Sequence, residues 1–444
     1  MQIGWSTQVF TPDRPAMLRG QKYRRVATDA MDPLTVTALA ISDAAGGTDV
    51  VLVSLDIIGV RDNTLAAIRR RVEELVPALS GEQVIVCATH THSSLETTAG
   101  TYEHPGGDVL TPAECEEIIA NATADAVADA WEDRQPGAIG RAFDHAVVGH
   151  NRYAVYENGH AEMYGATDRD DFVQIGGYED HSVDMLFTWD EHETLTGVAL
   201  AVACPSQVDE HSERYTADYW HDVRVALRKR LGPDVAVLPL CSAAGDQSPH
   251  FLLYDREERD MRARSGQTER EAIATKIATA VERSLPSAEP LTTQAISHER
   301  REFRLDPLRI SEADRDAARV ELENLSPAEQ TSNWGERLVE VRDGEYTNEG
   351  VPIDIETHHV RIGDLALVTN PFELFLDYGL RITARSPAAQ TITVQLSCGS
   401  EGYLPTAVAR ERGGYGAIPP SATVGPVGGT QLVEGTLTAL QDIF

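Results

Sequence analysis

An apolar run leads directly into two histidines in the stretch Val84-Ile85-Val86-Cys87-Ala88-Thr89-His90-Thr91-His92. The five apolar residues predict a strand that is buried on both faces. Residues i and i+2 of an extended chain point to the same side, so both imidazoles can converge as the strand leaves the sheet. Zinc sites use neutral imidazoles and anionic ligands, and a catalytic site keeps one position open. The stretch therefore predicts a ligand pair, with two partly buried histidines beside a loop as the alternative.

The strongly negative charge of the chain limits the kinds of molecule that it can bind. The 444 residues carry a formal net charge of −32, with 42% hydrophobic residues. Such an excess of acid disfavours binding to nucleic acid backbones. Three lysines (Lys22, Lys229 and Lys276) stand among 38 basic residues. Scarce lysine with abundant acid predicts a protein that stays soluble in high salt, from a halophilic source, and an acidic mesophilic protein is the alternative.

The cysteines and the hydropathy pattern indicate the compartment. The cysteines are odd in number and widely spaced, which argues against a disulfide scaffold: Cys87, Cys115, Cys204, Cys241 and Cys398. The first residues lack a basic region followed by an apolar stretch, and no segment approaches the roughly 20 apolar residues that cross a bilayer. We expect a cytoplasmic protein without a transmembrane segment.

Apolar runs alternate with amphipathic segments along the chain. The runs predict buried strands at Val50–Leu55, Val84–Ala88, Val183–Thr188, Gly197–Cys204, Val235–Leu240, Leu365–Thr369 and Thr391–Leu396. Helical spacing marks Asn63–Leu79, Pro112–Trp131, Ala217–Leu231, Glu269–Leu285, Glu312–Leu325 and Leu432–Ile443. This alternation predicts an α/β fold with a mixed sheet and flanking helices, in one domain over residues 1–444, with an early βαβ unit at 50–88. Charged segments at Asp255–Arg264 and Leu322–Gly350 predict surface insertions.

Polar side chains follow several of these strands, at the edge where open α/β sheets place active sites. Asp56 could orient a ligating histidine or cap the next helix. Arg152, after a strand at Ala142–Val148, could hold an anion or lie on the surface. Cys204 could bind zinc as a thiolate or belong to the core.

Three further residues follow later strands. Ser248, in the turn Gly245-Asp246-Gln247-Ser248-Pro249, could be a nucleophile, an oxyanion donor or only a turn residue. Glu373 offers a carboxylate ligand and Tyr403 a phenolate or a transition-state donor. Each has an ordinary structural explanation, but together they favour a site.

The order of these motifs resembles that of the neutral (alkaline, non-lysosomal) ceramidases, a family of zinc-dependent amidases. The resemblance covers essentially the whole chain and rests on Thr11-Pro12, Asp32-Pro33-Leu34, His90-Thr91-His92-Ser93, Asn151-Arg152, Gly245-Asp246-Gln247-Ser248-Pro249, Pro371-Phe372-Glu373 and Gly402-Tyr403-Leu404-Pro405-Thr406. It implies one zinc per chain, held by His90, Glu373 and Tyr403. It also implies that His92, Asp56 and Arg152 line the site and that Ser248 lies nearest the chemistry.

The sequence departs from the family at three places. Cys204 stands where the family has its remaining histidine ligand, so a thiolate would complete the site, with His211 as the alternative. Ser93-Ser94 replaces the family's Ser-Gly-Pro. The chain ends at Phe444, which predicts no C-terminal immunoglobulin-like domain and puts a membrane-lipid function in doubt.

The resemblance implies hydrolysis of an amide by metal-activated water, in N-acyl sphingosine or another N-acyl compound. In this mechanism His92 moves protons, Ser248 and Tyr403 donate to the oxyanion, and Arg152 orients the substrate. Hydrolysis of an ester or a lactone is an alternative. A carboxylate pair such as Asp56 and Asp246 could instead cleave a glycosidic bond. A zinc- or ligand-binding homologue without activity is a third possibility. The sequence leaves the oligomeric state open.

Overall fold

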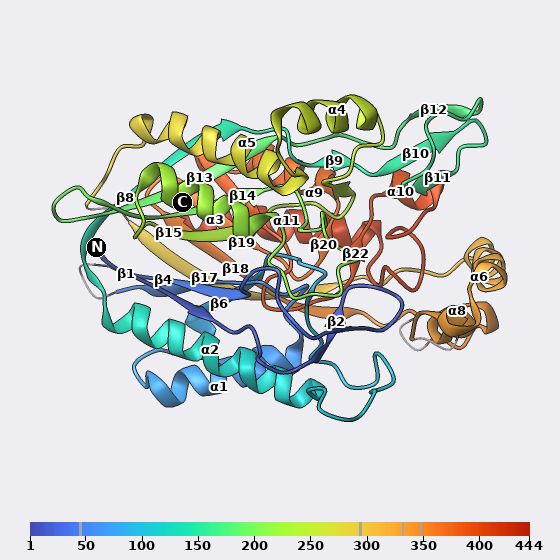
Figure 1. Cartoon of the computed structure of the whole chain (residues 1–444), viewed down its shortest axis with the longest axis horizontal. Helices are drawn as coiled ribbons and strands as arrows, with labels where there is room; N and C mark the ends of the chain where they lie inside the picture. The colour runs from blue at the N-terminus through green and yellow to red at the C-terminus, as the bar shows by residue number, and fades with distance from the viewer. Residues whose placement is uncertain (44–46, 293–294, 331–332, 347–348) are drawn as a thin grey trace.

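The apolar runs of the sequence form strands in the computed structural model, which describes residues 1–43, 47–292, 295–330, 333–346 and 349–444 (Figure 1). Strands β6 (Val84–Ala88) and β19 (Leu365–Thr369) have the predicted bounds. β6 pairs in parallel with β5 (Asp49–Leu55) across helix α1 (Asp62–Leu75), which confirms the early βαβ unit. The predicted α/β class with a mixed sheet is confirmed.

An eight-stranded mixed sheet has the order β15-β14-β13-β8-β1-β4-β5-β6. The β5–β6 and β14–β15 pairs are parallel, and the other pairs are antiparallel. Its remaining strands are β1 (Gln2–Val9), β4 (Thr35–Ser42), β8 (Gln135–His145), β13 (Ser182–Asp190), β14 (Leu195–Val202) and β15 (Ala236–Cys241).

The two halves of this sheet pack face to face. Only two residue pairs join β1 to β8. Leu39 and Val53 of one half share a core cluster with Leu186 and Leu238 of the other half. The outer face of the first half carries α1 and α2 (Pro112–Glu132), and that of the second half carries α3 (Tyr219–Leu231) and α5 (Glu269–Ser284) (Figure 1).

A four-stranded sheet completes the core, in the order β17 (Ile296–Leu305), β18 (Ile353–Ile362), β19 and β21 (Gln390–Val394). Alternate side chains of its strands point to opposite faces. Val360 and Leu367 join the central cluster, whereas Ile355 and Val368 pack with α9 (Leu376–Arg385) and α11 (Pro426–Ile443).

The remaining elements are short or peripheral. The strands are β2 (Ala16–Arg19), β3 (Arg25–Ala27), β7 (Ser94–Leu95), β9 (His150–Asn151), β10 (Tyr153–Tyr156), β11 (Ala161–Met163), β12 (Phe172–Ile175), β16 (Gln247–Ser248), β20 (Glu373–Leu374) and β22 (Tyr403–Leu404). The helices are α4 (Asp255–Ser265), α6 (Glu312–Asn324), α7 (Pro327–Gln330), α8 (Asn333–Asp343), α10 (Ala407–Arg412) and the 3-10 turns η1 (Gly81–Gln83) and η2 (Leu285–Ser287).

The two charged segments lie at the periphery. α4 has no buried residue, and α6 and α8 pack around a small core of their own (Figure 1). The second segment, Leu322–Gly350, includes residues 331–332 and 347–348, which lie outside the described residues. No helix in the described part of the chain is both long and apolar enough to cross a bilayer.

One strand was placed wrongly from the sequence. The predicted strand Ala142–Val148 overlaps β8 only at Ala142–His145, because β8 runs from Gln135 to His145. Its first half contains Gly137 and Gly140, which resemble turn residues. At each glycine a Cβ atom would come within 2.5 Å of a neighbouring carbonyl oxygen, that of Trp189 or Glu289. These glycines therefore permit close packing and do not end the strand.

Candidate active site

His90 and His92 converge as the sequence predicts, although His90 has left the strand. β6 ends at Ala88, and His90 has a φ of 66°. Its backbone N–H donates to the Ile57 carbonyl at 2.9 Å, which anchors the turn against the end of β5. The two Nε2 atoms lie 3.4 Å apart, with the rings nearly perpendicular at 81°.

The hydrogen bond made by Nδ1 of His90 leaves Nε2 free to bind a metal ion. Nδ1 lies 2.6 Å from the Ile58 carbonyl oxygen, which can only accept, so Nδ1 carries the proton. Nε2 then has a free lone pair, and it lies 3.3 Å from Glu373 Oε2. Two electron-rich atoms at this separation are typical of a position that a cation occupies.

Glu373 and Tyr403 reach this point from two short parallel strands. β20 and β22 pair in register, with Glu373 opposite Tyr403. The two side chains interact electrostatically, since each affects the pKa of the other. Burial and the Glu373 charge raise the pKa of Tyr403. Burial opposes ionisation of Glu373, but His90 and Tyr403 hold its pKa below the usual range. The structure thus gathers His90, Glu373 and Tyr403, three of the four predicted ligands.

This donor set fits a zinc ion. One imidazole nitrogen, one carboxylate and one phenol oxygen are all zinc ligand types, and His92 Nε2 lies 3.4 Å from His90 Nε2. In the described chain no lysine or arginine lies within ion-pair distance of Glu373, although the more distant charge of Arg152 also lowers its pKa.

Cys204 lies apart from this set. Its side chain is fully buried in an apolar cluster with Val148, Val202 and Tyr219. The sulfur contacts two backbone carbonyls, those of Pro205 at 3.5 Å and Val148 at 3.8 Å. Burial raises the pKa of the thiol. No described contact joins Cys204 to the three gathered residues, so its role as a ligand stays a prediction.

The loop after Cys204 folds back toward the site, but it does not bring His211 there. His211 is exposed, and its Nδ1 pairs with the Tyr23 hydroxyl at 3.1 Å. The loop instead brings Gln207 Nε2 to 2.9 Å from His92 Nε2, and Glu210 Oε2 to 3.7 Å from His92 Nδ1. Glu210 Oε1 lies 3.5 Å from His250 Nε2.

Sequence reasoning missed Gln207 and Glu210 beside His92, and His250 beside Glu210. Gln207, Glu210 and His250 all lie in or just beyond segments that follow predicted strands. Their position after Cys204 and Ser248 was the available signal. Local sequence gave no reason to choose them over other polar residues of the same loops.

Arg152 and Ser248 are both buried, and Arg152 lies close to Tyr403. Arg152 donates to the Gly245 carbonyl at 2.8 Å, and its guanidinium carbon lies 5.4 Å from the centre of the Tyr403 ring. The Ser248 hydroxyl accepts hydrogen bonds from the Tyr164 hydroxyl at 3.2 Å and from the backbone N–H of His250 at 3.1 Å.

Asp56 belongs to a separate buried ion pair. Arg224 binds both of its oxygens, at 2.9 and 3.0 Å, and Thr35 donates to it from its backbone and its hydroxyl. The partner of His90 Nδ1 is therefore the Ile58 carbonyl and not Asp56. Asp246, the other member of the carboxylate pair, is bonded to Asn151 and to the backbone of Leu376.

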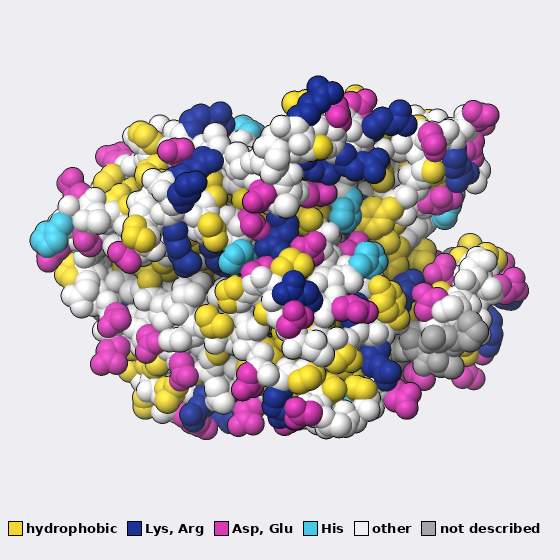
Figure 2. Space-filling view, viewed as in Figure 1, with side chains coloured by type: hydrophobic (Ala, Val, Ile, Leu, Met, Phe, Trp, Pro, Cys, Tyr) yellow, Lys and Arg dark blue, Asp and Glu magenta, His cyan; other side chains and the backbone are white. Residues whose placement is uncertain are grey.

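A cavity of about 210 Å³ opens onto the gathered residues, and His90, His92, Glu373 and Tyr403 all line it. Gly20 forms part of the wall with a φ of 128°, where a Cβ atom would lie 2.6 Å from the Cβ of His92. Residues of α8 line the cavity too. Figure 2 shows the molecule hollowed beside α6 and α8, with acidic side chains scattered over the face around it.

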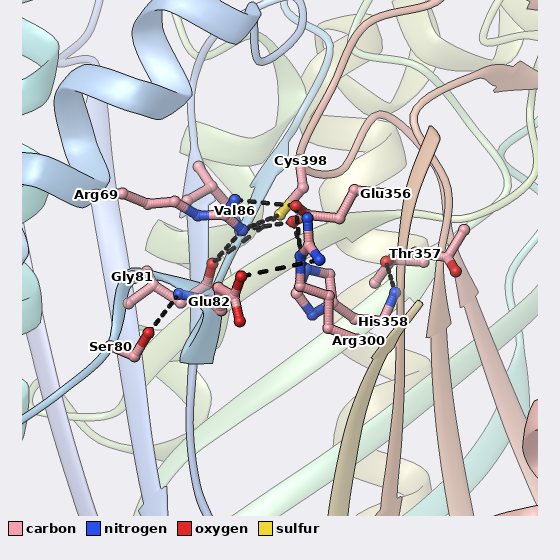
Figure 3. Close-up of polar contacts among 12 residues, drawn as sticks. Arg69, Ser80, Gly81, Glu82, Val86, Arg300, Glu356, Thr357, His358 and Cys398 are labelled. Carbon is pink, nitrogen blue, oxygen red and sulfur yellow. Dashed lines mark hydrogen bonds and ion pairs between the residues drawn. The ribbon is translucent and has the colours of Figure 1, made fainter. Parts of the chain in front are cut away.

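A second cluster of metal-ligand residue types lies elsewhere, beside β6 (Figure 3). Glu356, His358 and Cys398 place their ligand atoms within 4.8 Å of one another. However, Arg69 and Arg300 both bind the Glu356 carboxylate, at distances of 2.5 to 3.0 Å. Arg69 also lies 3.7 Å from the Cys398 sulfur. Two guanidinium groups already neutralise this cluster and would repel a metal ion.

Two solved structures resemble the whole chain. A neutral ceramidase from Pseudomonas aeruginosa superposes with a TM-score of 0.71 and 16% sequence identity, over 99% of this chain and 74% of that one. The chain has a neutral-ceramidase-like fold. A ceramidase complexed with C2 superposes with a TM-score of 0.70 and 15% identity, over 99% of this chain and 75% of that one. No family model and no curated protein matches the sequence.

The resemblance that the sequence motifs indicated is therefore confirmed for the fold. Within the neutral-ceramidase-like fold, the His-Thr-His, Pro-x-Glu and Gly-Tyr motifs meet at one cavity.

Proposed function

We propose that this chain is a zinc-dependent hydrolase that cleaves the amide bond of an N-acyl compound. One observation carries the proposal: His90 Nε2, the Glu373 carboxylate and the Tyr403 hydroxyl converge at a cavity that is open to solvent. The neutral-ceramidase-like fold supports the same class of reaction. Zinc held by these three residues would supply a Lewis acid for a carbonyl oxygen and activate water near neutral pH.

His92 is the proposed proton-transfer residue. Its Nε2 lies beside His90, and its Nδ1 is buried with no hydrogen-bond partner among the described residues. Glu210, 3.7 Å from that nitrogen, can stabilise the imidazolium that forms when His92 takes a proton. Gly20 packs directly against His92, an approach that a residue with a Cβ atom would not permit.

Tyr403, Ser248 and Arg152 would serve the oxyanion. Tyr403 lines the cavity, and its hydroxyl can donate to a substrate oxygen. Ser248 accepts two hydrogen bonds, so its own proton is available for donation. Arg152 is a buried cation near the Tyr403 ring and would favour negative charge developing there.

Metal content tests the proposal. Elemental mass spectrometry of the purified wild type should find about one zinc per chain, and His90→Ala should lose it. His192→Ala, which removes an exposed histidine far from the cavity in sequence, is the matched control and should keep the metal. Wild type without metal, after controls for stripping during purification, would contradict a zinc enzyme.

Cys204→Ala belongs in the same experiment. Loss of zinc would assign the thiolate as the fourth ligand, whereas retention would leave His90, Glu373 and Tyr403 as the protein ligands. Hydrolysis of short N-acyl compounds should disappear on chelation and return with zinc. If the metal is present but no amide or ester is hydrolysed, the chain is a binding homologue.

A further inference from the structure

The cavity wall has a charge opposite to that of the chain as a whole. Four of the described lining residues are cationic, Arg19, Lys22, Arg61 and Arg337, and Glu373 is the one acid among them. The protein carries a net charge of −32, and Lys22 is one of its three lysines. A cationic wall on such a strongly acidic protein focuses a positive potential at the cavity.

Two of these cations already have carboxylate partners. Arg19 binds Glu96 at 2.9 Å, and Lys22 lies 3.5 Å from Glu321. Lys22 also lies over the Trp334 ring, 4.2 Å from its centre, which fixes the ammonium group at the wall.

The other two cations have no carboxylate partner within ion-pair distance in the described chain. The closest described acceptor for the Arg61 side chain is the Ser400 carbonyl, at 3.4 Å. Arg61 is partly buried and directly precedes α1, whose first backbone N–H groups add partial positive charge. Burial lowers the pKa of Arg61, and the neighbouring charges of Arg19 and Arg337 lower it further, whereas Glu96 and Glu401 partly offset this effect. A bound anion would relieve this repulsion.

The cavity is also small. Its volume of about 210 Å³ is below the roughly 300–1,000 Å³ of sites that enclose drug-sized ligands. It therefore accommodates a compact polar group near the scissile bond more readily than two lipid chains.

We propose that the substrate carries an oxyanion, such as a carboxylate or a phosphate, close to its amide bond, and that Arg61 and Arg337 bind this group. Guanidinium groups suit this task because they pair with both oxygens of such an anion. The inference rests on the proposed amide hydrolysis for its meaning, but anion binding can be measured without turnover.

A pair of ligands that differ only in charge tests the proposal. N-acetylglycine carries a carboxylate next to an amide, and N-acetylglycinamide is its neutral counterpart. Binding of each to the metal-loaded wild type is measured by calorimetric titration at low and high salt, with inorganic phosphate as a third probe. We expect N-acetylglycine to bind at least about tenfold more tightly than the neutral amide, and high salt to reduce this preference.

Variants assign the preference to the two arginines. Arg61→Gln and Arg337→Gln should each reduce it about threefold or more, and the double variant should abolish it. Arg259→Gln on α4 removes an exposed arginine outside the cavity and should leave it unchanged. Phosphate binding that is lost in the double variant would indicate that a phosphate is accepted, and retained N-acetylglycine selectivity with no phosphate binding would indicate a carboxylate.

Failure of this proposal differs from failure of the proposed function. Equal binding of both ligands, binding of neither at millimolar concentration, or a preference that survives in the double variant would overturn the oxyanion site. Arginine-dependent binding of N-acetylglycine without hydrolysis of any amide would keep the oxyanion site and overturn the hydrolase. Equally efficient hydrolysis of charged and neutral amides would keep the hydrolase and overturn the oxyanion site.

Discussion

Two buried clusters of this molecule combine histidine with carboxylate, and they differ in how their charge is balanced. At Glu356 and His358, Arg69 and Arg300 supply the counter-charge from within the protein (Figure 3). At His90 and Glu373, no described guanidinium reaches the carboxylate, and both side chains line a cavity. The first arrangement is complete without a ligand. The second leaves lone pairs directed at a position that a cation from outside can fill.

The largest difference between the two clusters is expected in the stability of variants that neutralise Glu356 or Glu373. Glu356→Gln leaves Arg69, Arg300 and His358 close together without their anion, so we expect a loss of about 3–5 kcal/mol in the free energy of unfolding. Glu373→Gln should cost less, up to about 1 kcal/mol in the metal-free protein, because no arginine or lysine of the described chain pairs directly with Glu373 and none is left without its partner. Urea denaturation of both variants gives the comparison.

Glu302→Gln provides the matched control. Glu302 pairs with Arg300 at 2.8 Å but is mostly exposed, so its loss should cost at most about 1 kcal/mol. A cost for Glu373→Gln as large as that for Glu356→Gln would show that the candidate site is structural.

Tyr403→Phe tests the candidate site through its chemistry. The variant removes one hydroxyl from a ring that stays packed, so the fold should persist. We expect kcat/KM for an amide substrate to fall by about two to three decades, as when one oxyanion donor is lost. Steady-state kinetics at saturating zinc measures this, with Tyr378→Phe as the control, since that hydroxyl donates to the Pro405 carbonyl outside the cavity. Unchanged turnover in Tyr403→Phe would remove the hydroxyl from the mechanism.

The dependence of stability on pH should reveal the internally balanced cluster. Burial opposes protonation of His358, but Cys398 and Glu356 raise its pKa to about 9. A pKa above the unfolded value of about 6.5 means that the stabilisation is fully present below pH 6.5 and is lost as the pH rises to about 9. The shift corresponds to about 3 kcal/mol.

The measurement is the difference in unfolding free energy between wild type and His358→Gln from pH 6 to pH 10. This difference should shrink by up to about 3 kcal/mol across the range. A constant difference would mean that His358 is neutral in the folded protein and that Glu356 is balanced by its arginines alone.

The smallest effect is expected for metal content in Cys398→Ser. If the arginines exclude a cation from this cluster, the variant should hold as much zinc as the wild type, by elemental mass spectrometry. Loss of zinc in Cys398→Ser, with zinc kept in His90→Ala, would mean that the metal binds at the Glu356 cluster and not at His90.

The local sequence alone predicted the long strands that lead into the site, but not the short strands β20 and β22 that carry Glu373 and Tyr403. Apolar runs such as Val84–Ala88 and Leu365–Thr369 needed no tertiary information, because burial on both faces of a strand leaves a continuous hydrophobic signal. Polar residues after such runs, including His90, Glu373 and Tyr403, were predictable as site candidates for the same reason. Their meeting at one cavity was implied by the resemblance and is seen in the structure.

Only the tertiary structure decided which of the charged side chains are neutralised by an oppositely charged residue. Asp56 and Glu373 both follow a predicted strand, yet Arg224, 168 residues away in sequence, neutralises the first. His211 was a reasonable candidate ligand, but the fold places it at the surface and brings Gln207 and Glu210 to His92. Local sequence encodes burial and periodicity, whereas charge balance depends on contacts between distant segments. For this reason the sequence determined the candidates, and the packing of distant segments around the ends of β6, β20 and β22 determined which of them face the cavity.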